Sequence, residues 1–358
     1  MRRRLATAAL VPLASLALGC ASAIPSPPVA VGERLAVERE IADASRAALE
    51  RDQSVRYWEI FLTDEENRAG FTEEQKALLA EVPAREVASS LHDQTLREHG
   101  VTMVEVVRLS PDVLRAVSAE ADPETSSSLL EVAAFVEWAQ AAVHRRIQSV
   151  GSRVAEASGR SDVTILPEPA AGLNAFVPVE FGSNRVFVGT ELAVSAASDD
   201  ELACAIGHEL AHLTEGHTRT GAWAKLGRNV LTATAGTALL AAAAYANPGA
   251  PIGPSQIEGA FALGRLTGVA LADVPLRLGG WERGQEREAD AVGLYYAWRA
   301  GYDPDACASN MLRMARHAAA QGHTEQVSWW RVHPVSSERV VALRKLAAAA
   351  QAGTLEKR

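Results

Sequence analysis

The segment His208-Glu209-Leu210-Ala211-His212 has residue types and a spacing that suit metal chemistry. At about 100° per residue, an α-helix places His208 and His212 on one face, about 40° apart. Two imidazoles one turn apart can bind the same Zn²⁺, and Glu209 beside them can reach a water bound to that ion. Zinc would lower the pKa of the water to about 7 and polarise a carbonyl, while the glutamate takes the water proton and returns it to a leaving amine. The segment predicts a hydrolytic zinc site with Glu209 as catalytic base; the alternative is a charged helix with surface histidines.

A catalytic zinc needs a third protein ligand, which must come from another segment. The candidate is Glu286-Arg287-Glu288-Ala289-Asp290, in which Glu286 and Asp290 lie one helical turn apart on one face. One of these carboxylates can bind zinc while the other orients a ligand histidine, and Glu288 falls off the shared face. The alternative is the solvated, charged start of a helix.

His217 is a further histidine close to the first motif. It follows His208 by nine residues, so a continuing helix would point its side chain about 180° away from the pair. A longer motif with a third histidine ligand would also require glycine at position 215 and histidine at 218, where this chain has Glu215 and Thr218. We therefore interpret His217 as structural.

Strand signals occur in a short window before the motif, whereas helical signals dominate the rest of the chain. Residues 163–166 and 185–188 are β-branched or alternate in polarity, and turn-forming residues flank them. We predict an α+β fold in which helices dominate. A small β-sheet would accompany the helix that carries the His-Glu-x-x-His motif and a second helix that carries Glu-x-x-x-Asp.

Residues 34–130 show helical patterns but no catalytic signature. Residues 34–66 have charged and apolar side chains at helical spacing, and Thr72 begins a capping box. Ser110-Pro111 has the form of another helix start, and a long amphipathic stretch covers 127–157. We interpret residues 34–130 as a helical accessory region whose default role is packing.

The first twenty residues have the pattern of an export signal. Three arginines precede an apolar run that is shorter than the roughly 20 residues of a spanning helix and ends at Gly19-Cys20. The segment resembles a bacterial lipoprotein signal, in which Cys20 becomes the lipidated first residue; the alternative is an ordinary secretory signal with a chance cysteine. Because Ala rather than Asp follows the cysteine, we expect sorting to the periplasmic face of the outer membrane. Residues 22–32, with three prolines, predict an extended tether.

The charge balance argues against nucleic acid as a partner. The 358 residues include 35 basic and 44 acidic ones, a net charge of −9, and 48% of the chain is hydrophobic. Removal of the signal takes away three arginines and no acid, which leaves 32 basic residues and a net charge of −12. Nucleic-acid binding needs basic surface that displaces counterions, so we expect none.

Two features of the mature chain leave alternatives open. Cys204 and Cys307 either pair, in an oxidising compartment, or remain two buried thiols. Residues 229–257 are uncharged and lie between the two motifs, so they predict a packed helix, a mobile lid over the cleft or a membrane span. We favour the first two, because the stretch is rich in Ala, Thr and Gly and Asn247-Pro248 interrupts it.

Several motifs follow one another in a characteristic order. After the first two come Gly293, the segment Ala300-Gly-Tyr-Asp-Pro304 and the segment His333-Pro-Val-Ser-Ser-Glu-Arg339. In this order they resemble the gluzincin metallopeptidases of the HtpX, BepA and CAAX-prenyl-endopeptidase family, over about residues 140–348. HtpX and prenyl-endopeptidase relatives carry spanning helices around these motifs, whereas the lipoprotein and periplasmic branch, which this chain resembles, does not.

The resemblance implies roles for the matching residues. Glu286 would be the third ligand of one Zn²⁺ per chain, and Asp290 and Arg339 would support the site by orienting its ligands without binding the metal themselves. His333 would lie near the zinc, as a regulatory fourth ligand or as a group that stabilises the transition state. Asn174-Ala175-Phe176 matches the segment before the edge strand that aligns a substrate by β-addition.

We therefore expect a zinc metalloendopeptidase that acts on polypeptides, and the resemblance implies quality control of misfolded envelope proteins. The rival is a chaperone-like or binding envelope lipoprotein whose zinc site is latent or blocked by His333. A purely structural zinc is disfavoured by the intact Glu209 and the carboxylate third ligand. The expected parts are a signal peptide (1–19), a lipid anchor and tether (20–33), a helical accessory region (34–130) and a zinc metallopeptidase domain (131–358).

Overall fold

The computed structural model describes residues 24–178, 182, 184–217, 281–320 and 336–356. The signal segment, Cys20, residues 229–257 and His333 lie outside this part of the chain, so the predictions made for them stay predictions. Within the described residues, no helix combines the length and the apolar character that crossing a membrane requires.

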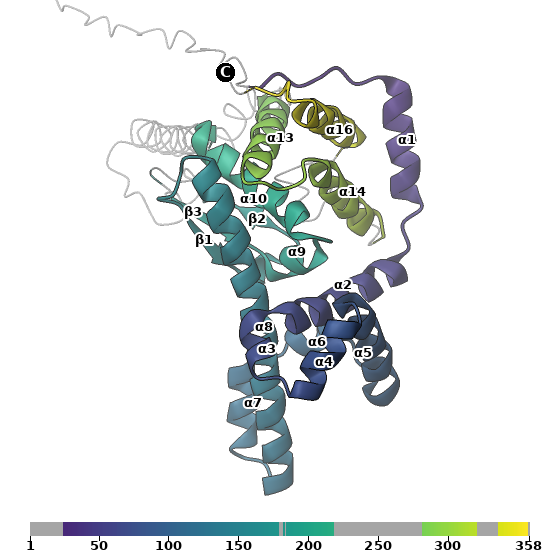
Figure 1. Ribbon diagram of the computed structural model, residues 1–358, viewed down its shortest axis with the longest axis vertical. Coiled ribbons are helices and arrows are strands. Elements are labelled where there is room, and N and C mark those ends of the chain that lie inside the picture. Colours follow the sequence, from purple (N-terminus) through teal and green to yellow (C-terminus); the bar gives the residue numbers. More distant parts are fainter. Residues whose placement is uncertain (1–23, 179–181, 183, 218–280, 321–335, 357–358) are drawn as a thin grey trace, which may run out of the picture.

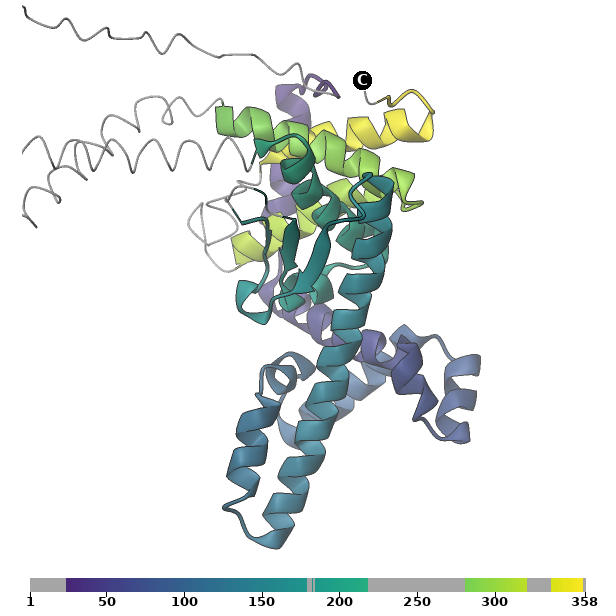
Figure 2. The same ribbon diagram turned by 90° about the vertical axis from the view of Figure 1, so that its left-hand side faces the viewer.

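Helices dominate the fold, as predicted, and surround one small sheet (Figures 1 and 2). The sheet has the order β1-β3-β2, with β1 (Thr164–Pro167) parallel and β2 (Ala175–Phe176) antiparallel to the central β3 (Arg185–Val188). The two predicted strand segments are β1 and β3. The described α-helices are α1 (Val31–Ala42), α2 (Arg46–Thr63), α3 (Glu65–Ala69), α4 (Glu73–Glu81), α5 (Ala84–His99), α6 (Met103–Val107), α7 (Pro111–Ser118), α8 (Pro123–Ala157), α9 (Thr190–Ser195), α10 (Asp199–Thr214), α13 (Trp281–Arg299), α14 (Asp305–Ala320) and α16 (Ser337–Gln351).

Side-chain caps divide the N-terminal helical pattern into separate helices. The Ser45 side chain accepts a hydrogen bond from a backbone N–H at the start of α2, and Asp64 does the same at the start of α3. The predicted capping box at Thr72 begins α4, and the predicted N-cap Ser110 begins α7. These caps satisfy backbone N–H groups that have no partner inside their helices.

Helix α8 connects the accessory region to the sheet. Its 35 residues cross the predicted boundary at residue 130, and at 1.5 Å per residue the helix is about 50 Å long. The N-terminal part forms a projecting hairpin with α7, while the C-terminal part runs beside β1 in the body of the protein (Figures 1 and 2). Ala139, Ile147 and Val154 of α8 belong to a core cluster that also includes residues of α2 and of the sheet. The accessory helices therefore share a hydrophobic core with the sheet.

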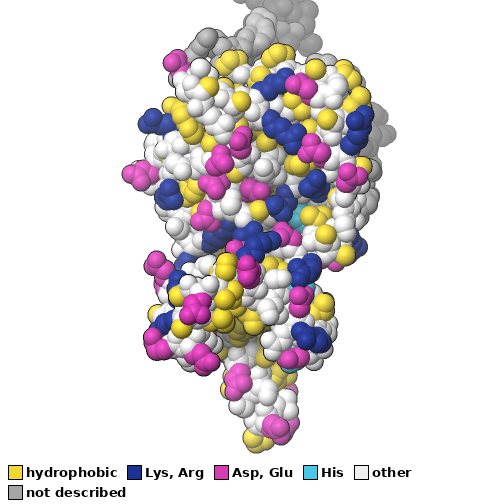
Figure 3. Space-filling view, turned by 45° about the vertical axis from the view of Figure 1, so that its right-hand side comes forward, with side chains coloured by type: hydrophobic (Ala, Val, Ile, Leu, Met, Phe, Trp, Pro, Cys, Tyr) yellow, Lys and Arg dark blue, Asp and Glu magenta, His cyan; other side chains and the backbone are white. Residues whose placement is uncertain are grey.

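Apolar side chains also lie on the surface of the α7–α8 hairpin. Val113 and Val117, one turn apart on α7, are 60% and 53% exposed, and Trp138 of α8 is 54% exposed. Figure 3 shows apolar side chains gathered where the body meets the hairpin, whereas basic and acidic side chains are mixed over the body. Packing within the described residues leaves these apolar side chains uncovered.

The predicted tether packs against the protein where the structure describes it. Ile24 is buried, and the Lys345 ammonium donates a hydrogen bond to the Pro28 carbonyl at 2.7 Å. Helix α1 begins at Val31, inside the predicted tether, and Glu33 accepts a hydrogen bond from the backbone N–H of Ala30 there. Helix α1 therefore starts two residues before the predicted end of the tether, and the described part of the tether packs against the protein.

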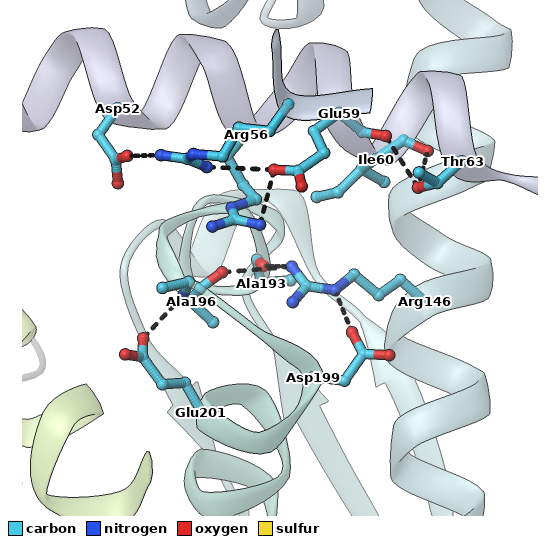
Figure 4. Close-up of polar contacts among 12 residues, drawn as sticks. Asp52, Arg56, Glu59, Ile60, Thr63, Arg146, Ala193, Ala196, Asp199 and Glu201 are labelled. Carbon is cyan, nitrogen blue, oxygen red and sulfur yellow. Dashed lines mark hydrogen bonds and ion pairs between the residues drawn. The ribbon is translucent and has the colours of Figure 1, made fainter. Parts of the chain in front are cut away.

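Contacts between arginines and carboxylates hold the start of α10, and Figure 4 shows one of them, between Arg146 of α8 and Asp199. Arg313 of α14 donates to Asp52 of α2 at 3.1 Å and to Glu201 of α10 at 3.0 Å. Arg146 of α8 donates to Asp199 at 2.7 Å, at the first residue of α10. These charge-assisted bonds hold the N-terminal end of α10 in place.

Cys204 and Cys307 form a disulfide, so of the two alternatives for these cysteines the structure has the pair. Their Cα atoms are 5.0 Å apart, and both residues are buried. The bond joins α10 to α14 one helical turn before His208. It therefore fixes the zinc-motif helix against a second helix of the core.

We expect loss of this disulfide to lower the free energy of unfolding by about 2–4 kcal/mol, because the bond restricts the unfolded chain. The crosslink closes a loop over a sequence separation of 103 residues. Urea unfolding of the wild type and of a Cys204→Ser, Cys307→Ser double variant, with and without reductant, measures the effect. The double variant should not respond to reductant. Equal stability of oxidised and reduced wild type would contradict the prediction.

Candidate metal centre

The His-Glu-x-x-His motif lies on α10, which is buried over most of its length. The Ser198 side chain caps the helix, and three acidic residues in the first turn complement the helix dipole. His208 and His212 are 6% and 9% exposed, and their Nε2 atoms are 3.1 Å apart. The predicted common face is present, and the alternative of surface histidines is wrong.

Glu286 of α13 reaches both histidines. One carboxylate oxygen lies 3.4 Å from His208 Nε2, and the other lies 3.4 Å from His212 Nε2. The three side chains are buried, and each offers a ligand atom within 4.8 Å of the others. The structure therefore brings together the three predicted ligands, and the alternative of a solvated helix start is wrong for Glu286.

Two glycines allow α10 and α13 to approach closely enough for this contact. A Cβ on Gly207 would lie 2.5 Å from the Gly293 carbonyl oxygen, and a Cβ on Gly293 would lie 2.5 Å from the His208 nitrogen. Real Cβ atoms do not approach backbone atoms so closely, so each position requires glycine. The two backbones meet directly beside His208.

The donor set and its spacing fit Zn²⁺. Two histidine nitrogens and one carboxylate oxygen are a ligand set of catalytic zinc, which keeps a fourth position open. Donors about 2.1 Å from a tetrahedral ion lie about 3.4 Å from one another. The three distances here are 3.1, 3.4 and 3.4 Å. Buried imidazole nitrogens and a carboxylate converge in this way only around a shared proton or a cation.

Asp290 and Arg339 support His208 from the side away from the donors. His208 Nδ1 lies 3.0 Å from an Asp290 carboxylate oxygen, so in the neutral, metal-binding form of this imidazole the proton stays on Nδ1 and Nε2, on the side of Glu286, is free to bind a metal. Arg339 of α16 donates two bonds of 2.7 Å to the Asp290 carboxylate and lies 3.0 Å from Glu286. All four side chains are buried. These contacts are the ones that a supporting role for Asp290 and Arg339 needs.

The charges of this cluster control protonation when no metal is bound. Burial disfavours the imidazolium form of His208, but the hydrogen bonds and charges of Asp290 and Glu286 outweigh burial and raise the pKa of His208 to about 10. Burial also raises the pKa of Asp290, but the guanidinium of Arg339 and the imidazole of His208 outweigh burial and lower it. At neutral pH, the metal-free site therefore holds a proton on His208.

We expect zinc affinity to rise with pH, because a bound ion must displace the His208 proton. Displacement of this one proton makes the dissociation constant for zinc fall about tenfold for each unit of rising pH between roughly pH 6 and pH 9. This range lies below the raised pKa of His208, where the metal-free imidazole is protonated. Competition with a chromophoric chelator, corrected for the chelator's own protonation, measures the slope. An affinity that does not change with pH would show that His208 is already neutral in the metal-free protein.

His217 lies against His212, so the prediction that it points away from the pair of motif histidines is wrong. Helix α10 ends at Thr214, and Gly216, with φ of 75°, turns the chain before the residue is reached. His217 Nδ1 lies 2.9 Å from His212 Nδ1, and its Nε2 lies 3.2 Å from a Glu288 oxygen. Burial lowers the pKa of His217, which keeps this imidazole neutral at pH 7. The segment Thr214-Glu215-Gly216 after an apolar run is a sequence signal for the end of a helix. The helical spacing used to place His217 does not apply beyond that end.

The sheet edge lies beside the motif. Of the segment Asn174-Ala175-Phe176, predicted to precede an edge strand, Ala175–Phe176 is itself the edge strand β2 and pairs with β3, and the Asn174 carbonyl accepts a hydrogen bond from Gly189 at the end of β3. Ala175 lines a cavity of about 30 Å³ together with His208 and Glu209. This volume holds about two water molecules, at about 10–15 Å³ each. Asn310, which sequence reasoning missed, also lines the cavity, and its buried Oδ1 has no hydrogen-bond partner among the described residues.

Comparison with known proteins gives one match. The family model of Peptidase family M48 matches residues 141–347, a range that contains every described residue of the site. No curated protein and no solved structure matches the chain. The match covers more than half of the sequence and agrees with the resemblance to HtpX, BepA and CAAX-prenyl endopeptidases. The chain therefore belongs to peptidase family M48 and is a metallopeptidase.

Proposed function

We propose that the protein is a zinc-dependent endopeptidase that cleaves within unfolded polypeptides. The observation that carries the proposal is the buried convergence of His208, His212 and Glu286, with Glu209 between the two histidines in the sequence. The donor atoms fit zinc, and the family is one of metallopeptidases. A structural zinc would not need a base beside an open position.

Glu209 and strand β2 would share the work of the reaction. Glu209 is buried and lines the water-sized cavity, so it is placed to accept a proton from the attacking water and to deliver one to the leaving amine. Bound zinc would polarise the scissile carbonyl and lower the pKa of the water. The edge strand β2 would pair with an extended substrate backbone, which positions the scissile bond without requiring a particular sequence.

We further propose that the mature chain is anchored through a lipid on Cys20 at the periplasmic face of the outer membrane and acts there on misfolded envelope proteins. The export pattern of the first twenty residues supports this location. The Cys204–Cys307 disulfide supports it independently, because such bonds persist in oxidising compartments. A substrate that is recognised through its backbone would suit misfolded chains of varied sequence.

Incubation of the zinc-loaded mature chain with an unfolded protein, followed by mass spectrometry of the products, tests the activity. We expect internal cleavage that a chelator abolishes and added zinc restores. Substrate trapping with the Glu209→Gln protein in its native envelope then tests the substrate class. Binding of unfolded chains without cleavage would favour the chaperone-like alternative, and release of terminal residues alone would contradict an endopeptidase.

A further inference from the structure

Each of the two ligand histidines has its own chain of outer contacts. The Nδ1 atom of His208 lies 3.0 Å from the carboxylate of Asp290. His212 instead contacts His217, with 2.9 Å between their Nδ1 atoms, and the far nitrogen of His217 lies 3.2 Å from Glu288. Each ligand histidine is therefore connected to a carboxylate: His208 contacts Asp290 directly, and His212 is connected to Glu288 through the imidazole of His217.

The hydrogen-bond types place the protons along the second chain. The Glu288 carboxylate accepts only, so Nε2 of His217 carries the proton and donates it. In a neutral imidazole the other nitrogen then accepts, so His217 Nδ1 receives a bond from the Nδ1–H of His212. His212 is left with a bare Nε2, the atom that lies 3.4 Å from Glu286. This is the form of His212 that can bind a metal.

We infer that His217 and Glu288 are positioning residues that hold His212 in its metal-binding form and orientation. The inference rests on the proposed zinc site and adds two residues to it. The chain of contacts joins His212 near the end of α10, His217 just after that helix and Glu288 of α13.

The local structure is built to hold this chain of contacts. Gly216 has a φ of 75°, a conformation that glycine adopts readily, and it returns His217 to the side of His212. The side chains of His217 and Glu288 are 7% and 13% exposed, so water competes little for their bond. Glu288 also lies two residues after Glu286 on α13, so one helix supplies a direct ligand and the outer support for another ligand.

The test compares zinc dissociation constants, measured by chelator competition, for His217→Leu and His217→Gln. Leucine fills the space without hydrogen bonds, and we expect it to weaken zinc binding about 10- to 100-fold. Glutamine can accept from His212 and donate to Glu288 with its amide, so it should recover most of the affinity. Glu288→Ala should also weaken zinc binding, and it tests the chain of contacts from its other end if His217→Leu does not fold.

His317→Leu is the matched control, because this histidine of α14 is equally buried but lines a different cavity. It should leave zinc affinity unchanged, even where it lowers thermal stability. The visible spectrum of the Co²⁺-substituted protein provides a second readout, which should change for His217→Leu and not for the control.

Unchanged zinc affinity in both His217→Leu and Glu288→Ala would overturn the inference, as would equal losses for His217→Leu and His217→Gln. A wild type that binds no zinc would overturn it together with the proposed function. A wild type that binds zinc but cleaves nothing would refute only the peptidase proposal, because the affinity measurements do not depend on cleavage.

Discussion

Replacement of Glu209 by glutamine is expected to lower kcat/KM for peptide cleavage by about 10²- to 10⁴-fold while zinc stays bound. Glutamine has nearly the same shape but cannot accept the proton of the attacking water. Glu209 is not among the three clustered donors, His208, His212 and Glu286, so its charge is not needed to hold the metal. Initial rates on a quenched-fluorescence peptide and metal content by mass spectrometry measure the two effects together.

Glu191→Gln provides the control for this substitution. Glu191 pairs with Arg108 away from the cavity that Glu209 lines, and the same chemical change there should leave the rate nearly unaltered. A Glu209→Gln protein that cleaves at the wild-type rate would exclude Glu209 as the base. Loss of zinc along with activity would instead make Glu209 part of the metal site.

Replacement of Arg339 by methionine is expected to lower the free energy of unfolding of the metal-free protein by about 3–5 kcal/mol. Arg339 is buried and neutralises two buried carboxylates, with two bonds of 2.7 Å to Asp290 and a 3.0 Å contact to Glu286. Methionine keeps much of the volume but leaves both carboxylates without their cation. Urea unfolding in the presence of a chelator measures the loss.

Two comparisons isolate the electrostatic part of this effect. Arg344→Met removes an arginine from the same helix, where its 2.9 Å pair with Glu40 is partly exposed, and should change stability by only about 0–1 kcal/mol. Saturating zinc should reduce the loss in Arg339→Met, because a dication beside Glu286 replaces part of the missing charge. Equal losses for the two variants would show that Arg339 acts through packing alone.

Much of the metal centre follows from local sequence. His208 and His212 share a face because a helix repeats every 3.6 residues, and the same periodicity places Glu286 and Asp290 together. The capping residues and the two longer strands are also local signals, and the structure confirms them. That Glu286 meets the two histidines is a contact between distant segments, and it was predicted through a resemblance to known peptidases.

The features that sequence reasoning missed depend on where chains turn and which distant residues meet. His217 was misplaced because periodicity was carried three residues past the helix end at Thr214. Pairing of Cys204 with Cys307 requires α10 to pack against α14, which no local pattern reports. Ile24 is buried for the same reason: its partners lie elsewhere in the chain.

The crossing of α10 and α13 at Gly207 and Gly293 bears on how this protein can change over evolution. Since backbone atoms meet there, the separation of the two helices is independent of the volume of any side chain at the crossing. Substitutions among the surrounding apolar residues can accumulate without moving His208 relative to Glu286. The two glycines themselves cannot be replaced without separating the helices. A library that randomises the core should therefore yield active proteins with many different apolar residues around the crossing, but with glycine at positions 207 and 293.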